Sequence, residues 1–194
     1  MPRTPDELSW PVRTARLTIR PATEADVDAT FRYRKLPEVS LWLTSAPADR
    51  TAYAETTCEP DRLARTLVVE LDGEVIGDLM LMIEDAWAQT EVAEDAAGVQ
   101  AELGWVLAPE FAGHGYATEA VRELIRICFE DLGLRRVTAN CFLDNTASWR
   151  LMERLGMRRE VHTLNESLHR SGAWLDGLGY ALLADEWRSA LAAE

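Results

Sequence analysis

Short runs of alternating or β-branched apolar residues predict β-strands along the chain. The first run covers residues 17–20 and stops at Pro21, which cannot donate a hydrogen bond to a neighbouring strand. Thr66–Leu71 and residues 74–82 are two further runs, and Asp72-Gly73 joins them. Because Asp-Gly suits the tight turn of a hairpin, these two runs predict a pair of antiparallel strands.

The sequence predicts four helices, which cover residues 23–35, 49–63, 117–132 and 145–155. In the third of them, apolar residues at helical spacing mark one face. Thr23 precedes an acidic first turn and is the expected N-cap of the first helix. Gly133 and Gly156 follow the last two helices at the place where a left-handed C-terminal cap belongs.

Four later segments complete the predicted strands. They are residues 102–108, residues 137–143, Arg158–Leu168 and Trp174–Leu183. Gly172 and Gly177 are expected to interrupt the last pair, and the acidic residues 84–100 are expected to form a loop. The order of strand, two helices, three strands, helix, strand, helix and two strands predicts an α+β (mixed α/β) fold with a mostly antiparallel sheet.

Length and charge limit the domain organisation and the partners. The 194 residues suffice for one hydrophobic core, and no linker rich in Gly, Ser or Pro divides them, so we expect a single domain over residues 1–194 with residues 1–12 as an N-terminal extension. The formal net charge of −13 argues against direct nucleic-acid binding, which needs a basic surface. The same charge fits either a cationic substrate or an ordinary acidic, soluble surface.

The cysteines and the lack of long apolar runs indicate a cytoplasmic protein. Cys58, Cys128 and Cys141 are odd in number and widely spaced, and the last two lie in apolar contexts typical of core thiols. No apolar run approaches the ~18 residues of a membrane span, and no signal-peptide pattern follows the N-terminus. His162 and His169 have no metal-ligand spacing to any cysteine or carboxylate pair, so no metal is expected.

Two glycines stand between the strand that ends at Pro109 and the long helix that follows. The run is Ala112-Gly113-His114-Gly115-Tyr116-Ala117. Glycines allow successive N–H groups to converge, and the helix start adds unpaired N–H groups, so the run predicts an anion site that suits a pyrophosphate. By itself Gly-x-Gly fits an ordinary strand-to-helix turn better, and Thr118 excludes a Rossmann fingerprint because it replaces the third glycine.

Four sequence blocks in order make this pattern specific. They are residues 14–21, residues 102–107 with 113–120, residues 140–157, and residues 172–183. From about residue 13 to residue 187 the chain resembles the GNAT superfamily of N-acetyltransferases, and most of all its ribosomal-protein alanine or serine N-terminal acetyltransferases. This resemblance implies the GNAT acyl-CoA N-acyltransferase fold, in which the central sheet is flanked by helices and splayed between its fourth and fifth strands.

The resemblance also implies the reaction and the donor site. It implies an acyl-CoA-dependent N-acyltransferase that moves an acetyl group from acetyl-CoA to a protein N-terminus or a small amine, by direct attack in a ternary complex, and a protein that often forms homodimers. A backbone N–H at Val106 or Leu107 is expected to polarise the thioester carbonyl. The CoA phosphates and arm are expected to contact Ala112, Gly113, His114, Gly115, Tyr116, Ala117, Asn145 and Ser148.

Three side chains are the candidates for chemistry at the acceptor. Glu102 is expected to act as the general base, directly or through a water, and Ser148 as the acid beside the departing thiolate. Asn140 is expected to orient the substrate. Each also fits an ordinary structural role, as a strand-edge carboxylate, a first-turn helix residue and a polar group of the sheet.

Two departures from the family pattern keep alternatives open. Glu110 stands where the family usually has Gln or Arg, and Met152 stands where many members have a catalytic tyrosine. A non-catalytic acyl-CoA-binding module is therefore an alternative, as is a transferase that uses another donor such as succinyl-CoA.

Overall fold

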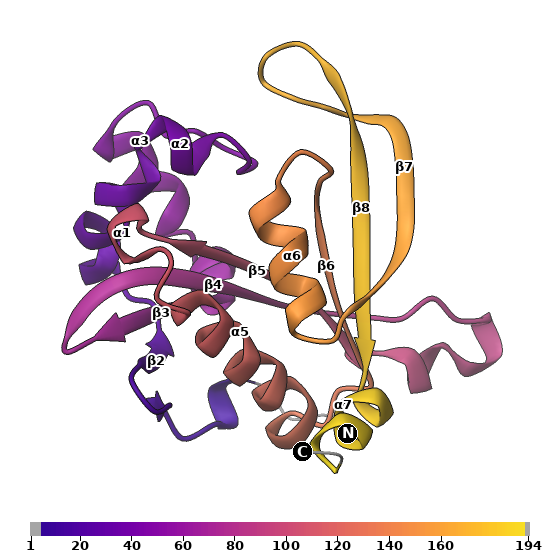
Figure 1. Cartoon of the computed structure of the whole chain (residues 1–194). Coiled ribbons are helices and arrows are strands. Elements are labelled where there is room, and N and C mark those ends of the chain that lie inside the picture. The colour runs from indigo at the N-terminus through magenta and orange to yellow at the C-terminus, as the bar shows by residue number, and fades with distance from the viewer. Residues whose placement is uncertain (1–4, 193–194) are drawn as a thin grey trace. The chain divides into compact units, whose positions relative to one another are not determined.

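The structure, a computed structural model, describes residues 5–192 (Figure 1). Its described residues form two compact units. The first unit comprises Leu8–Leu81 and Gly104–Leu124, and the second unit comprises the rest of the described chain. Each unit is therefore built from segments that are far apart in the sequence.

Eight strands in the described residues form the sheet, with hydrogen-bonded neighbours in the order β1-β2-β3-β4-β5-β6-β8-β7. They are β1 (Val12–Arg13), β2 (Thr18–Pro21), β3 (Thr66–Leu71), β4 (Glu74–Glu84), β5 (Gln100–Leu107), β6 (Arg136–Phe142), β7 (Arg158–Leu168) and β8 (Trp174–Leu183). β5 and β6 are parallel, whereas β2 with β3, β3 with β4, β6 with β8, and β7 with β8 are antiparallel. The predicted mixed α+β, mostly antiparallel fold is confirmed.

Helices flank this sheet. They are α1 (Val27–Arg34), α2 (Pro37–Ser40), α3 (Arg50–Thr57), α4 (Pro60–Ala64), α5 (Tyr116–Arg126), α6 (Thr146–Arg154) and α7 (Ala184–Leu191). In the first unit Ile19, Val68 and Ile76 are fully buried core residues. In the second unit Val137 and Met152 are fully buried, the latter on α6, which runs beside β6 and β8 (Figure 1).

The parallel ladder between β5 and β6 is short. It pairs Gln100 with Arg136, Ala101 with Val137, and Glu102 with Thr138. β6 continues beyond this ladder to Phe142 and pairs with β8 along its whole length. The ladder therefore ends in the region where the GNAT fold is expected to splay between its fourth and fifth strands, which are β5 and β6 here.

Three predicted helices differ from the observed ones. The helix expected over residues 23–35 is a 3₁₀ turn at Glu24–Asp26 followed by α1, which begins at Val27. The helix expected over residues 49–63 is two helices, since α3 ends at Thr57 and α4 begins at Pro60. Proline has no N–H for the interior of a helix but suits the first helical position. The helix expected over residues 117–132 starts at Tyr116, and its last turn, Ile127–Asp131, is a π-helix in which Leu132 N donates to Ile127 O at 2.9 Å.

Other segments were predicted closely. Arg158–Leu168 and Trp174–Leu183 are strands with the expected bounds and form a long hairpin (Figure 1). Gly172 lies in its turn with φ +87°. β8 runs through Gly177, which pairs with Phe142 and Thr163, but the β7–β8 register shifts between Thr163 and Ser167, directly beside this glycine. Residues 84–100 contain the 3₁₀ helix Thr90–Ala96 within the expected loop.

Three elements were not predicted. They are β1, α2 and α7. β1 has two residues and α2 has four, which is too short for a periodic pattern to be recognised.

No helix among residues 5–192 is long and apolar enough to span a membrane.

Candidate active site

The Gly113-His114-Gly115 run forms the predicted loop between β5 and α5. A 3₁₀ turn at Pro109–Phe111 follows β5. After this turn, Gly113 and Gly115 have φ values of +82° and +80°. These are left-handed conformations that residues with a Cβ rarely adopt, so the glycines are required for the path of the chain. α5 begins at Tyr116, directly after the second glycine.

The loop has the properties of an anion cradle. In the part of the chain that the structure describes, the N–H groups of Gly113, His114, Gly115 and Tyr116 have no acceptor. A Cβ built on Gly113 would meet no atom within 4 Å, so the space beside it is open. Unpaired N–H groups at the start of a helix favour an anion such as a pyrophosphate, and the residues present fit the phosphates of CoA on this test.

Arg16, Glu119 and Thr14 form a hydrogen-bonded group beside the loop, and the sequence analysis did not assign them a role. Arg16 Nη1 donates to His114 O at 3.0 Å, and Arg16 Nε donates to Glu119 Oε2 at 2.7 Å. Thr14 Oγ1 donates to Glu119 Oε1 at 2.6 Å. Residues 14–21 and 113–120 both belong to the four sequence blocks that resemble the GNAT family. This shared membership was the only sequence signal for a role of Arg16 and Thr14, and nothing in the spacing of the two blocks indicated that they are in contact.

Glu110, the departure from the family pattern, also lies beside an arginine. Arg32 Nη2 of α1 approaches Glu110 Oε1 at 3.7 Å, while Arg32 Nη1 pairs with Glu74 Oε1 at 2.8 Å. These side chains are about half exposed, so the pair is a screened surface interaction. It nevertheless places a positive charge from α1 next to the carboxylate at position 110.

The backbone of β5 at Val106 and Leu107 lies against a glycine of β4. A Cβ on Gly77 would lie 2.5 Å from Val106 O and 3.3 Å from Leu107 Cα. Just beyond, Ala108 N donates to Ile76 O at 2.8 Å. Gly77 therefore permits the close approach of β4 to the segment where the thioester is expected.

Glu102 and Asn140 are brought together in the second unit. Glu102 pairs with Thr138, and Asn140 is two residues further along β6, so all three side chains face the same side of the sheet. Asn140 Nδ2 donates to Glu102 Oε1 at 3.3 Å. On β8, Gly179 pairs with Asn140, and a Cβ there would lie 3.1 Å from Asn140 Oδ1, so the missing side chain makes room for this amide.

Asn145 and Ser148 are adjacent at the start of α6. Asn145 is the N-cap, and its side chain accepts from Ser148 N at 3.4 Å. Burial raises the pKa of the Cys141 thiol to about 11, although a hydrogen bond with the Ser148 side chain acts in the opposite direction. The Ser148 hydroxyl therefore lies at the end of β6, beside a cysteine that stays protonated at neutral pH.

Other candidate chemistry is not supported. Burial raises the pKa of Cys128 far above its ordinary value, and all three cysteines are free thiols. Among the described residues no group of three His, Cys, Asp or Glu side chains is arranged to hold a metal ion. His162 Nε2 instead lies 3.0 Å from Asp176 Oδ2 on the β7–β8 hairpin.

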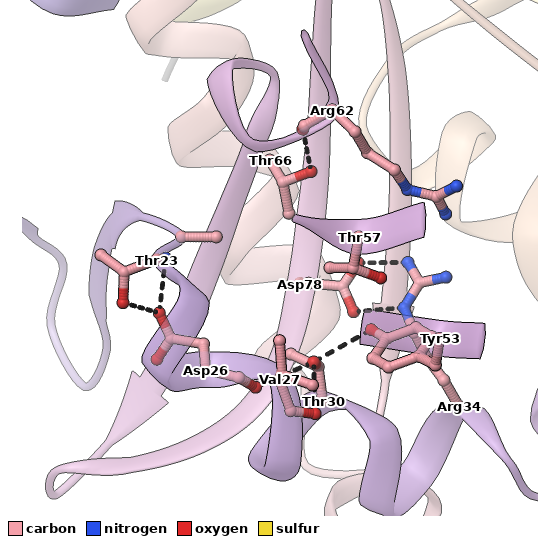
Figure 2. Close-up of a pocket in the computed structure, with 11 residues that line it drawn as sticks. Thr23, Asp26, Val27, Thr30, Arg34, Tyr53, Thr57, Arg62, Thr66 and Asp78 are labelled. Carbon is pink, nitrogen blue, oxygen red and sulfur yellow. Dashed lines mark hydrogen bonds and ion pairs between the residues drawn. The ribbon is translucent and has the colours of Figure 1, made fainter. Parts of the chain in front are cut away.

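A small polar cavity lies in the first unit (Figure 2). Its lining includes Arg34, Tyr53, Thr57 and Asp78. Its volume is about 20 Å³, the space of roughly one water molecule, so it is too small for an amine acceptor. Arg34 and Tyr33 both donate to the buried Asp78 carboxylate, the latter at 2.7 Å, which identifies this cluster as structural.

The mostly antiparallel sheet with its one parallel pair, and the glycine loop before α5, agree with the fold of GNAT acetyltransferases. The chain matches the family described as "Acetyltransferase (GNAT) domain" over residues 16–158, and it belongs to this family. The resemblance noted from the sequence is thereby confirmed. Membership places the chain among the N-acyltransferases.

Individual relatives agree with this assignment. The chain is 36% identical over 86 residues to YnaD of Bacillus subtilis (strain 168), described as an uncharacterized N-acetyltransferase; the alignment spans 44% of this chain and 50% of that protein. It is 27% identical to a GNAT acetyltransferase structure from Bacillus anthracis, with a TM-score of 0.75 over 90% of this chain and 99% of the other. Mycobacterium smegmatis RimJ in complex with CoA-disulfide is 25% identical, with a TM-score of 0.71 over 91% and 88%.

Proposed function

We propose that this protein transfers an acetyl group from acetyl-CoA to an amine, and that the acceptor is a protein N-terminus or a small amine. The observation that carries this proposal is the loop before α5, where two glycines of positive φ leave four N–H groups without an acceptor among residues 5–192. Such a loop suits the pyrophosphate of CoA. The complex of the similar RimJ with CoA-disulfide supports the same donor.

The reaction balances as a direct transfer. The amine nitrogen forms a bond to the thioester carbonyl carbon, the carbon–sulfur bond breaks, and CoA leaves as a thiolate that takes up a proton. Glu102 accepts the proton that the ammonium must lose, directly or through a water. Asn140, which donates to Glu102 at 3.3 Å, orients that carboxylate and the incoming amine.

The donor half of the site uses the other predicted residues. The backbone N–H of Val106 or Leu107 polarises the thioester carbonyl, and Ala112 to Ala117 hold the phosphates. Ser148 lies beside the sulfur and donates to the developing thiolate, while Asn145 contacts CoA and caps α6. Acetyl-CoA is thus a co-substrate, and the proposal includes no metal.

The wider predictions belong to the same proposal. We treat residues 1–194 as a single, cytoplasmic GNAT domain that forms a homodimer. The net charge of −13 favours acceptors with positive charge near the amine over nucleic acid.

The test is release of CoA, detected with a thiol reagent, over a panel of N-terminal peptides, polyamines and amino acids. Glu102→Gln keeps the shape of the side chain but cannot accept the proton, so we expect kcat to fall roughly 10²- to 10⁴-fold. Glu24→Gln, an exposed carboxylate in the turn before α1, is the matched control and should retain full activity.

Three outcomes would contradict parts of the proposal. If acetyl-CoA raises the thermal stability but no acceptor releases CoA, the chain is an acyl-CoA-binding module. If succinyl-CoA is preferred to acetyl-CoA, the donor is wrong. If Glu102→Gln retains full activity, Glu102 is a structural carboxylate of β5.

A further inference from the structure

Arg16 connects three parts of the first unit. It lies between β1 and β2, yet its side chain reaches the phosphate loop and the first turn of α5. Its guanidinium contacts Glu119 Oε2 through Nε at 2.7 Å and through Nη2 at 2.6 Å, and its backbone N–H donates to Glu119 Oε1 at 2.9 Å. Its Nη1 donates to the His114 carbonyl at 3.0 Å.

The first consequence is electrostatic. Glu119 lies in the first turn of α5, where its negative charge would oppose an anion bound at the same helix end. Burial alone would raise its pKa, but hydrogen bonds from Thr14 and Arg16 and the Arg16 charge lower the pKa below its ordinary value. Glu119 is therefore ionised, and Arg16 cancels its charge beside the cradle.

The second consequence is geometric. In a trans peptide the C=O and the following N–H point in opposite directions. Because Arg16 holds the His114 carbonyl on its own side, the Gly115 N–H is turned to the other side. The Arg16 guanidinium also lies 4.5 Å from the centre of the Tyr116 ring, and a Cβ on Gly115 would lie 3.5 Å from Arg16 Nη2. The Arg16 side chain is therefore close to three successive loop residues, His114, Gly115 and Tyr116.

We propose that Arg16 is a positioning residue for the donor, which sets the direction of the Gly115 N–H and neutralises Glu119 so that the loop binds the pyrophosphate of acetyl-CoA. This inference rests on the proposed function. Arg16 does not touch the acetyl group in this scheme, so its loss weakens donor binding and leaves the chemical step intact.

The test compares acetyl-CoA with acetyl-pantetheine, which carries the same thioester but no phosphate. For Arg16→Gln we expect the KM for acetyl-CoA to rise roughly 10- to 100-fold, because charge-assisted hydrogen bonds are lost. The kcat, the KM for the acceptor and the activity with acetyl-pantetheine should change less than about 3-fold. Arg13→Gln is the matched control and should leave all constants unchanged, since within residues 5–192 the Arg13 side chain donates only to Thr18 Oγ1 on the neighbouring strand.

A second pair of variants separates positioning from simple folding. Arg16→Lys keeps the charge but loses the planar fork, so it should show an intermediate KM for acetyl-CoA, and it also serves if Arg16→Gln does not fold. The double variant Arg16→Gln with Glu119→Gln removes the Glu119 carboxylate, which Arg16→Gln alone would leave without its ion-pair partner. The His114 carbonyl still lacks its hydrogen bond from Arg16 in this double variant. We expect it to recover only part of the donor affinity.

Calorimetric measurement of CoA binding distinguishes a failure of the Arg16 inference from a failure of the proposed function. If the native chain binds CoA and Arg16→Gln or Arg16→Lys binds it equally well, the Arg16 inference is wrong and the proposed function stands. If Arg16→Gln loses activity equally with acetyl-CoA and acetyl-pantetheine, Arg16 is merely structural. If the native chain binds no CoA at all, the proposed function fails first.

Discussion

Gly77 and Gly104 show how single residues determine how closely β4 and β5 approach each other. Both lie inside strands of the first unit, and neither has a positive φ. A Cβ on Gly77 would meet the carbonyl oxygen of Val106 at 2.5 Å, whereas a Cβ on Gly104 would meet the Met80 side chain at 3.3 Å. The contact at Gly77 is far below the van der Waals distance and involves a backbone atom held in a sheet, whereas the contact at Gly104, with Met80 Cβ, requires a shift of only a few tenths of an ångström.

Gly77→Ala should therefore destabilise the protein much more than Gly104→Ala. Forcing an atom into such a space costs about 2–3 kcal/mol, which lowers the Tm of a chain of this size by roughly 4–12 °C. For Gly104→Ala we expect a loss below about 1 kcal/mol. Urea denaturation of the two variants measures the difference, and equal stability of both would show that β4 and β5 are less tightly paired at Gly77 than the structure indicates.

Among the candidate site residues, Glu102 and the two loop glycines could be proposed from the sequence because they stand at fixed places relative to a strand and a helix. Arg16 could not. Its partner Glu119 is 103 positions away, and an arginine before a strand has no local signal that distinguishes it from the many other arginines. Asn140 was a candidate, but its contact with Glu102 depends on the register of β5 and β6.

At the scale of elements, an ion-pair network ties β6, β7 and α7 together. Glu160 of β7 pairs with Arg136 of β6 at 2.5 Å and with Arg158 at 2.6 Å, and Arg158 also pairs with Glu186 of α7. The hydrogen bond from Arg136 is the main cause that lowers the pKa of Glu160 to about 2, with burial acting against it and Arg158 adding to it.

This shift predicts how stability depends on pH. Because the folded-state pKa of Glu160 lies below the unfolded value of about 4.3, the carboxylate stabilises the fold above that pH, and its contribution is lost as the pH falls through about 2. Glu160→Gln should therefore lower the urea midpoint at pH 7, and the gap to the native chain should narrow from about pH 4.5 downward. Glu55→Gln on exposed α3 is the control, and a gap that does not change with pH would contradict the assigned pKa.

The elements also show where local patterns are reliable. The hairpin at Asp72-Gly73 formed as expected, with φ values of +51° and +85°, because that pair of residues accepts left-handed conformations. The helix break at Pro60 follows from the chemistry of proline, which the prediction of one helix over residues 49–63 did not take into account. α7 was not predicted because no N-cap residue such as Ser, Thr, Asp or Asn stands between β8 and its first residue.

At the scale of the whole molecule, the chain crosses repeatedly between its two compact units. β4, β5 and α5 each begin in one unit and end in the other. An element shared in this way cannot lose its structure in one unit without losing hydrogen bonds in the other.

Unfolding should therefore be a single cooperative transition. We expect far-ultraviolet circular dichroism and tryptophan fluorescence to give the same urea midpoint, and the calorimetric enthalpy to equal the van't Hoff enthalpy. Acetyl-CoA at 100 times its Kd should raise the stability of this one transition by about 2.7 kcal/mol. Two separated transitions, with only one shifted by acetyl-CoA, would show that the units fold independently.

The sequence by itself determined the features that depend on neighbouring residues: the strands, the Asp72-Gly73 turn, the caps, and the loop glycines Gly113 and Gly115. These follow from backbone freedom and from spacings of two to four residues, which are visible in a single sequence. Only the tertiary structure decided that Arg16 holds that loop, that Asn140 donates to Glu102, and that Gly77 admits the Val106 carbonyl. Such contacts join residues 29 to 103 positions apart, and their formation depends on strand register and chain closure, which leave no periodic signal in the sequence.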